Sequence, residues 1–296
     1  MDQLGKVTTA TISIFGKAIT FNVVNVVMTW VIIALLLVLI LAAVRRLNIV
    51  PNKIQSIFEL IYEFIQEITE STLGEEDGKR YFPFILTLFL FILISNWIGI
   101  FPNVLKLFGV FAALLHALFG GAVNFVYEGA STSIFALSIQ PDPSSWYAAL
   151  LSAPGMEEPT RSVNTDLALG VLVFIVCHAY GLKNKGLGGY LKTYISEPFP
   201  SPIPMRGWLW VFAVVNPVVY FNLFMNIIGV VSTVVSHSFR LFGNIFGGGM
   251  IIVIVSSLLH YFIVPVGLFA FFGLFAGLVQ AFVFSMLAVT YIQQQQ

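Results

Sequence analysis

The sequence predicts an all-α membrane protein with several transmembrane helices, and three observations lead to this fold class. First, 58% of the 296 residues are hydrophobic and only 9% are charged, whereas soluble domains carry about 25% charged residues. Second, several stretches of membrane-spanning length contain no charged residue. Third, one further segment repeats its apolar residues at helical spacing. A chain of this length and composition suits a single membrane domain over residues 1–296.

The first two thirds of the chain contain three apolar stretches that suit transmembrane helices. They are residues 23–44, 81–101 and 166–182, and charged residues or proline close each of them. About 20 residues of helix cross the hydrocarbon core of a bilayer. We therefore expect three spans here, of which the third is the shortest.

The last third of the chain contains apolar stretches that are too long for one ordinary span each. Gly207 to Phe239 is uncharged for 33 residues, which is about 50 Å of helix against a hydrocarbon core of about 30 Å. Leu241 to Ile292 continues uncharged for another 52 residues. Such lengths indicate either several ordinary spans or long, strongly tilted helices, and the periodicity favours neither.

Residues 52–73 predict an amphipathic helix that does not cross the membrane. Apolar residues recur at helical spacing on one face, and glutamates occupy the other. The apolar face comprises Ile54, Ile57, Phe58, Ile61, Phe64, Ile65 and Ile68, and the polar face Glu59, Glu63, Glu67 and Glu70. Such a helix either packs on a soluble partner or lies in the membrane interface.

The distribution of lysine and arginine predicts the orientation of the spans. Nine of these residues lie in the loops after the first and third spans, and four lie on the opposite side. The positive-inside rule therefore places the two basic loops in the cytoplasm and residues 1–22 and 103–165 outside. The net charge is zero and no long basic run occurs, which argues against a nucleic-acid partner. The single cysteine, Cys177, excludes an internal disulfide.

Arg240 is the one residue among the 14 lysines and arginines that lies inside an apolar stretch. An arginine at the centre of a span costs at least ~2.5–3.5 kcal/mol on insertion scales, so it is a candidate functional residue. Residues 198–296 contain no aspartate or glutamate. An acid on another span, such as Asp166, remains a possible partner within this chain. We expect instead that the counter-charge comes from a different polypeptide.

A polar stripe surrounds Arg240 on one helix face. The residues of the stripe are spaced 4, 7, 4, 3 and 4 apart, and they are Asn222, Asn226, Thr233, His237, Arg240 and Asn244. Such a stripe either joins helices by hydrogen bonds or lines a path for water and ions. The arginine in the stripe favours the path. Further along, Gly273, Gly277 and Gln280 share a face that suits a closely packed partner helix.

Several short motifs follow one another in a specific order. Residues 238–243 read S-F-R-L-F-G, followed by Asn244, and residues 280–284 read Q-A-F-V-F. Earlier come Leu73-Gly74, Tyr81-Phe82-Pro83-Phe84, Asn96 with Gly99 and Pro102, Pro159-Thr160 with Asn164-Thr165, and K-G-L-G-G over 185–189. Over residues 52–102 and 159–292 the chain resembles the a subunit of F-type ATP synthases.

This resemblance implies a fold, a location and a set of partners. The fold has an N-terminal span, an interfacial cytoplasmic helix over 52–73, two further spans and a long tilted hairpin over 206–292. The location is the bacterial plasma (inner) membrane, with the C-terminus in the cytoplasm. The partners are the ring of c subunits, the b subunits of the peripheral stalk and the rest of the ATP synthase.

The resemblance also implies ion translocation. Arg240 would lie between two half-channels, hold each arriving ring carboxylate ionised and block direct passage of a cation. The residues expected along the ion path are Arg240, Asn244, Gln280, His237, Asn226 and Thr233. No catalytic residue, metal or cofactor is expected in this chain, which also has no phosphate-binding loop, so ATP chemistry belongs to other subunits. Both H⁺ and Na⁺ remain open as the coupling ion.

The sequence departs from the family pattern at three positions. Gly249, Gly273 and Asn226 stand where relatives often carry an acid or a histidine. The candidates that could replace these groups are His237, His260, His178 and Asp166. Each also has a purely structural interpretation. Asp166, for example, could cap the N-terminus of the third span.

A second class of function is a secondary transporter or channel that uses Arg240 to bind an anionic substrate. No internal repeat supports it. A structural membrane scaffold is a third class, and it predicts that loss of Arg240 is tolerated.

Overall fold

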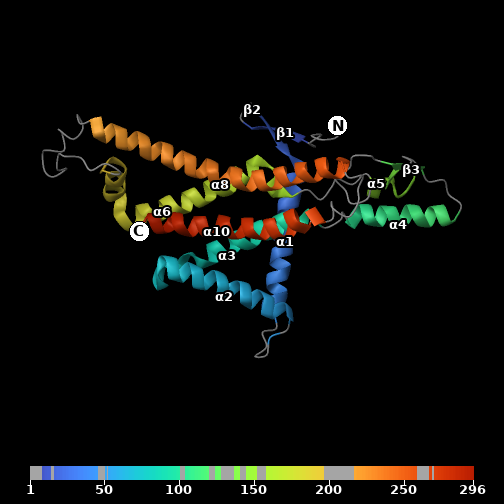
Figure 1. Cartoon of the computed structure of the whole chain (residues 1–296), viewed down its shortest axis with the longest axis horizontal. Helices are drawn as coiled ribbons and strands as arrows, with labels where there is room; N and C mark the ends of the chain where they lie inside the picture. Colours follow the sequence, from blue (N-terminus) through green and yellow to red (C-terminus); the bar gives the residue numbers. More distant parts are fainter. Residues whose placement is uncertain are drawn as a thin grey trace. The chain divides into compact units, whose positions relative to one another are not determined.

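Helices make up most of the computed structural model (Figure 1). The structure describes residues 9–14, 17–45, 51, 53–100, 104–119, 124–127, 137–140, 145–151, 158–196, 217–258, 267–268 and 270–296. The longer helices are α1 (Val23–Val44), α2 (Lys53–Leu73), α3 (Glu75–Ile98), α4 (Val104–Leu118), α6 (Val163–Ser196), α8 (Pro217–Leu258) and α10 (Gly277–Gln294). Short elements are α5 (Ala148–Leu151), the 3-10 helix η1 (Pro159–Arg161) and the π-helix η3 (Ala270–Ala276).

Five of the described helical segments are long and apolar enough to cross a membrane. They are Val23–Val44, Glu75–Ile98, Val163–Tyr194, Pro217–Val255 and Ala270–Gln294. These segments confirm the all-α, multi-pass membrane class that the composition predicts. Within the last third, α8 is one uninterrupted helix of 42 residues, which contains the described part of the first uncharged stretch, Arg240 and the beginning of the second stretch.

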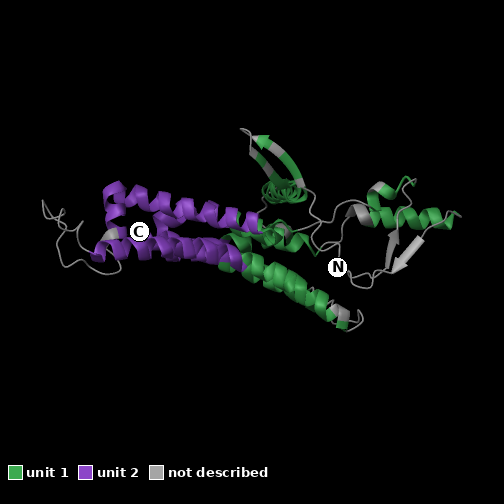
Figure 2. Ribbon diagram, turned by 90° about the horizontal axis from the view of Figure 1, so that it is seen from above, with its two compact units in different colours: residues 1–62, 87–162, 241–283 green, residues 63–86, 163–240, 284–296 purple. Residues whose placement is uncertain are grey.

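The chain divides into two compact units, drawn in green and purple in Figure 2. Unit 1 comprises residues 1–62, 87–162 and 241–283, and unit 2 comprises residues 63–86, 163–240 and 284–296. Both α8 and α10 therefore contribute one part to each unit.

In unit 1, Asn96 joins three elements that are distant in sequence. Its Nδ2 donates a 3.0 Å hydrogen bond to the carbonyl of Gly277, and its Oδ1 accepts one of 2.9 Å from the hydroxyl of Thr160. A Cβ on Gly277 would lie 3.1 Å from the Cβ of Asn96, so glycine permits this approach. The closely packed partner of the Gly277 face is therefore α3 of this same chain.

Two β-hairpins also belong to unit 1, and the helical patterns did not predict them. β1 (Thr9–Ile14) pairs antiparallel with β2 (Lys17–Asn22), and β3 (Asn124–Tyr127) pairs with β4 (Leu137–Gln140). The first hairpin leads directly into α1, where the side chain of Asn22 accepts a 3.2 Å hydrogen bond from the Asn25 N–H as an N-cap. Both hairpins lie in the segments 1–22 and 103–165, outside the predicted spans.

In unit 2, α6 is broken at Gly186, which has φ +67°. Left-handed backbone is accessible to glycine at little cost, so the chain bends there and a second helical part follows. That part brings Tyr190 beside Gly181, where an added Cβ would lie 2.9 Å from the Tyr190 ring. The glycine-containing loop therefore forms a tight bend within α6.

In unit 2, hydrogen bonds join the C-terminal end of α10 to the C-terminal end of α2. Gln293 and Gln296 on and after α10 donate hydrogen bonds of 3.1 and 2.9 Å to the carbonyls of Thr72 and Leu73, the last residues of α2. These carbonyls have no donor within their own helix, so the glutamines cap it. Nearby, the Tyr180 hydroxyl donates a 2.6 Å hydrogen bond to Asp77.

Candidate functional site

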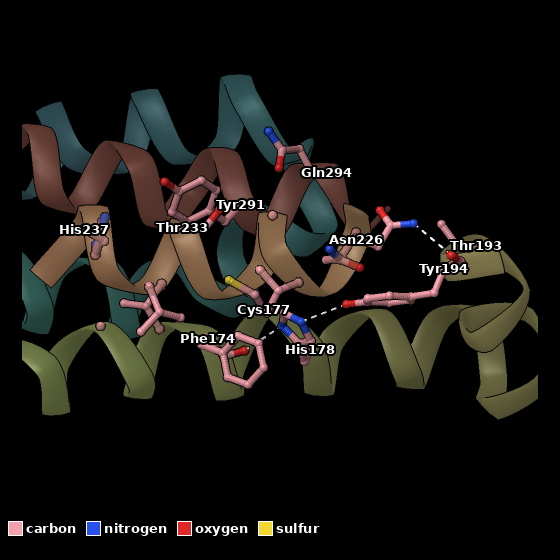
Figure 3. A pocket seen from close by; sticks show the side chains of 16 residues that line it. Phe174, Cys177, His178, Thr193, Tyr194, Asn226, Thr233, His237, Tyr291 and Gln294 are labelled. Atoms are coloured by element: carbon pink, nitrogen blue, oxygen red, sulfur yellow. Dashed lines mark hydrogen bonds between the residues drawn. The ribbon is translucent and has the colours of Figure 1, made fainter. Parts of the chain in front are cut away.

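Unit 2 contains a cavity of about 360 Å³ between α6, α8 and α10 (Figure 3). Its lining combines polar and apolar side chains. The polar lining residues are His178, Thr193, Tyr194, Asn226, Thr233, His237, Tyr291, Gln294 and Gln295. A cavity with this many hydrogen-bonding groups is able to hold ordered water.

Three residues of the polar stripe on α8 lie in this cavity. Asn226, Thr233 and His237 face it because a spacing of 7 and 4 residues returns to the same side of a helix. Asn226 also donates a 2.8 Å hydrogen bond to the backbone carbonyl of Tyr194, which fastens the bent part of α6 to α8. The stripe thus joins helices and lines a polar cavity at the same time.

His178 and two tyrosines form a hydrogen-bonded chain at the edge of the cavity. Nδ1 of His178 lies 3.0 Å from the Phe174 carbonyl, and Nε2 lies 2.9 Å from the Tyr194 hydroxyl. The hydroxyls of Tyr194 and Tyr190 are 2.9 Å apart. Neither tyrosine is among the residues that the sequence predicts for the ion path. Their spacing of one helical turn, directly after the glycine loop, could have indicated that both hydroxyls lie on the same helix face.

His237 occupies the end of the cavity nearest to Arg240 along α8. Its side chain is 2% exposed, and its ring packs on Phe284 and Tyr291 with centroid distances of 3.6 and 5.6 Å. Neither ring nitrogen has a hydrogen-bond partner among the residues that the structure describes. A buried imidazole beside a cavity large enough for several water molecules is placed to bond water on its cavity side.

Arg240 follows His237 by one turn of α8, and it is exposed. Within the described parts of the chain, no carboxylate forms a salt bridge with Arg240. Unlike Asn226, Thr233 and His237, it does not line the cavity.

The two remaining predicted site residues belong to unit 1. Asn244 lies one turn beyond Arg240 on α8 and is half-buried. Gln280 on α10 is 8% exposed, and its Nε2 has no hydrogen-bond partner among the described residues.

Gly249 and Gly273, which stand where relatives often carry an acid or a histidine, have different surroundings. A Cβ on Gly249 would meet no atom within 4 Å, whereas one on Gly273 would lie 2.6 Å from the side chain of Ile100. Gly273 therefore serves close packing in unit 1. His260, one of the candidate replacements, lies outside the described residues.

Asp166 does not cap the third span. The structure begins α6 at Val163, so Asp166 lies inside the helix, and neither of its carboxyl oxygens has a hydrogen-bond partner in the described part of the chain. Its side chain is fully buried, with 0% exposure. The capping interpretation of Asp166 is therefore wrong.

Within the described residues, no three His, Cys, Asp or Glu side chains gather as a metal site would require. The chemistry available in the cavity is hydrogen bonding and proton exchange by histidine, tyrosine and water.

Comparison with known proteins identifies the same family that the motifs in the sequence indicate. The family model for the ATP synthase A chain matches residues 26–293. ATP synthase subunit a of Citrifermentans bemidjiense is 32% identical over 268 residues, which cover 90% of this chain and 85% of that protein. The subunit a of Geotalea daltonii is 32% identical over 265 residues, covering 90% of this chain and 84% of the relative. This chain belongs to the ATP synthase A chain family.

Proposed function

We propose that this chain is the ion-translocating stator subunit of a rotary F-type ATP synthase, and that Arg240 faces a carboxylate of the c-ring. The observation that carries the proposal is the exposed Arg240 on a long apolar helix, without a carboxylate partner among the described residues. The absence of any acid over 198–296 supports it. Charged residues within membrane spans usually pair with an opposite charge, and an acid on an adjacent chain would supply one here.

Arg240 would act on the ring by electrostatics. At ~4 Å and an effective dielectric constant near 20, it attracts a carboxylate by about 4 kcal/mol before desolvation is subtracted. That attraction holds each arriving carboxylate ionised, so the carboxylate gives up its ion before it passes. The same positive charge repels a cation that would cross directly between the two half-channels.

The cavity in unit 2 would serve as one half-channel. It runs along α8 from Asn226 to His237, which is one turn from Arg240. Its other end holds Tyr194 and Gln294, at the end of α6 that the positive-inside rule assigns to the cytoplasm. An ion released beside Arg240 would therefore reach the cytoplasm through water in this cavity.

The remaining parts of the proposal concern assembly and location. The chain would assemble with the c-ring, the b subunits of the peripheral stalk and the rest of the ATP synthase. It would lie in the bacterial plasma membrane with its C-terminus in the cytoplasm. ATP chemistry would take place on other subunits.

Reconstitution tests the proposal against a self-contained channel or transporter. The purified chain is placed in vesicles with and without its c-ring and b subunits, and ion flux is driven by a K⁺ diffusion potential. We expect flux only with the ring present. Equal flux by the chain alone would contradict the proposal and favour the transporter interpretation.

A further inference from the structure

We propose that Asp166 is a proton-carrying group at the inner end of the cavity, and that protons exchange between its carboxyl group and water in the cavity. This inference rests on the proposed function, because it adds a residue to the same half-channel.

Burial makes Asp166 unusual among the acids that the structure describes. Its side chain has 0% exposure, and both carboxyl oxygens are without a hydrogen-bond partner in the described part of the chain. Burying an ionised carboxylate without partners costs far more than burying a neutral carboxylic acid. The neutral, protonated form is therefore the resting form that this site favours.

Helix geometry places Asp166 next to the cavity. Asp166, Gly170, Val173 and Cys177 are spaced 4, 3 and 4 apart and are all buried on one face of α6. The last three line the cavity, so Asp166 continues the lining face one turn beyond its end. Four residues of helix correspond to about 6 Å along the axis, roughly the length of two hydrogen-bonded water molecules.

At the end of the cavity, Gly170 of α6 lies against Ser238 of α8. A Cβ on Gly170 would lie 2.3 Å from Oγ of Ser238, so only glycine allows this contact. Ser238 follows His237, the last cavity-lining residue of α8, and precedes Arg240 by two positions. Asp166 on α6 and Arg240 on α8 thus each lie one turn beyond the same end of the cavity.

The surroundings of Asp166 indicate a proton as its ligand. A metal cation in a protein takes several ligands, and within the described residues no three His, Cys, Asp or Glu side chains gather around Asp166 or elsewhere. A proton needs no further ligand. The exchange is balanced: the neutral acid releases H⁺ to a cavity water, which becomes hydronium, and the carboxylate recovers H⁺ in the reverse step.

The alternative is an acid kept in the first turn of a helix for stability alone. An acid there is stabilised by the helix dipole only in its ionised form. Ionised acids in that role keep solvent or backbone N–H contacts, and Asp166 has neither among the described residues. Its burial therefore fits a group that spends time protonated.

The experiment compares Asp166→Asn and Asp166→Glu in the assembled membrane sector, without the catalytic sector. Proton flux driven by a K⁺ diffusion potential is recorded from pH 5 to 9 in Na⁺-free buffer, and the amount of assembled complex is measured separately. Leu167→Ala, at the adjacent exposed position of α6, is the matched control. The other titratable or charged groups of this region, His237 and Arg240 on α8 and Tyr291 on α10, are unchanged in all variants.

We expect Asp166→Asn to lower proton flux at least tenfold with assembly intact, and Asp166→Glu to conduct with a displaced pH profile. Wild-type flux in Asp166→Asn overturns the inference. If Asp166→Asn does not assemble, Asp166→Glu decides: a pH profile identical to wild type also overturns it, as does a requirement for Na⁺. Arg240→Ala is measured in parallel in vesicles that contain the complete synthase, because near-normal gradient-driven ATP synthesis in that variant would contradict the proposed function itself.

Discussion

The Tyr194 hydroxyl donates a hydrogen bond of 2.9 Å to Nε2 of His178. The direction follows from the other side of the ring, where Nδ1 lies 3.0 Å from the Phe174 carbonyl. A carbonyl only accepts, so Nδ1 carries the proton and Nε2 of the neutral ring is the acceptor. The bent part of α6 thereby orients a histidine at the edge of the cavity.

Tyr194→Phe tests whether this orientation matters for ion flux. The substitution removes the hydroxyl that bonds Nε2 but keeps the ring and the backbone carbonyl that Asn226 bonds. We expect ATP-driven pumping to slow several-fold in vesicles that contain normal amounts of complex. Tyr190→Phe is the matched control, because it leaves the bond from Tyr194 to His178 in place and should have the smaller effect. Equal rates in both variants would assign the chain of tyrosines to packing alone.

Arg240→Ala should abolish ATP synthesis driven by an ion gradient. In the proposed mechanism, removal of the guanidinium group leaves no charge to hold the ring carboxylate ionised and removes the barrier to direct passage, so passive ion leak should rise. Arg240→Lys should also fail, because an ammonium group is a compact, strongly hydrated charge that loses its proton more readily on burial. Gradient-driven synthesis in vesicles measures both, with assembly checked by purification. Near-normal ATP synthesis by the alanine variant would contradict the proposed role of Arg240 in ion translocation.

Asn244→Leu tests the part of the polar stripe beyond Arg240. Asn244 is half-buried on the turn after Arg240, so leucine removes a polar group from the proposed path while keeping the number and branching of the side-chain heavy atoms. We expect slower pumping by assembled complexes. Unchanged ATP-driven pumping would indicate that Asn244 only joins helices by hydrogen bonds and does not line an ion path.

Gly170→Ala should destabilise the contact between α6 and α8. The new Cβ would lie 2.3 Å from Oγ of Ser238, and such overpacking costs about 1–3 kcal/mol. We expect a lower thermal midpoint for the detergent-solubilised complex. The double variant Gly170→Ala with Ser238→Ala removes the clashing oxygen, and the next nearest atom of α8 is then the Val234 carbonyl oxygen at 3.3 Å. It should therefore recover most of the loss, whereas additive losses in the double variant would contradict the contact.

The fold class could be predicted because it depends on local properties of the sequence. Charge-free length and helical periodicity act within single segments, and the structure contains helices such as α1 and α8 where those patterns occur. The pairing of Asn96 with Gly277 could not be predicted, because the two residues are 181 positions apart and no periodicity connects them. The hairpin of β1 and β2 was not predicted, although residues 9–14 alternate polar and apolar side chains as a strand does, because the prediction rested on apolar stretches long enough to span a membrane and these two strands are only six residues each.

The candidate site was predictable on one of its three helices. The stripe on α8 follows from residue spacing, and Asn226, Thr233 and His237 do lie together in the cavity. The facing side of the cavity depends on the bend at Gly186, whose direction the sequence does not specify. Tyr194 and His178 became neighbours only through that bend. The roles of these residues in translocation stay predictions.

The glutamine caps on α2 have a consequence for biosynthesis. The Thr72 carbonyl receives its hydrogen bond from Gln293, 221 residues later in the chain. At translation rates of about 5–20 residues per second, roughly 10–45 s pass between synthesis of the helix end and synthesis of its donor. During that interval water or another protein must satisfy the open carbonyls. A nascent chain arrested before residue 293 should therefore exchange the amide hydrogens at the end of α2 faster than the finished one.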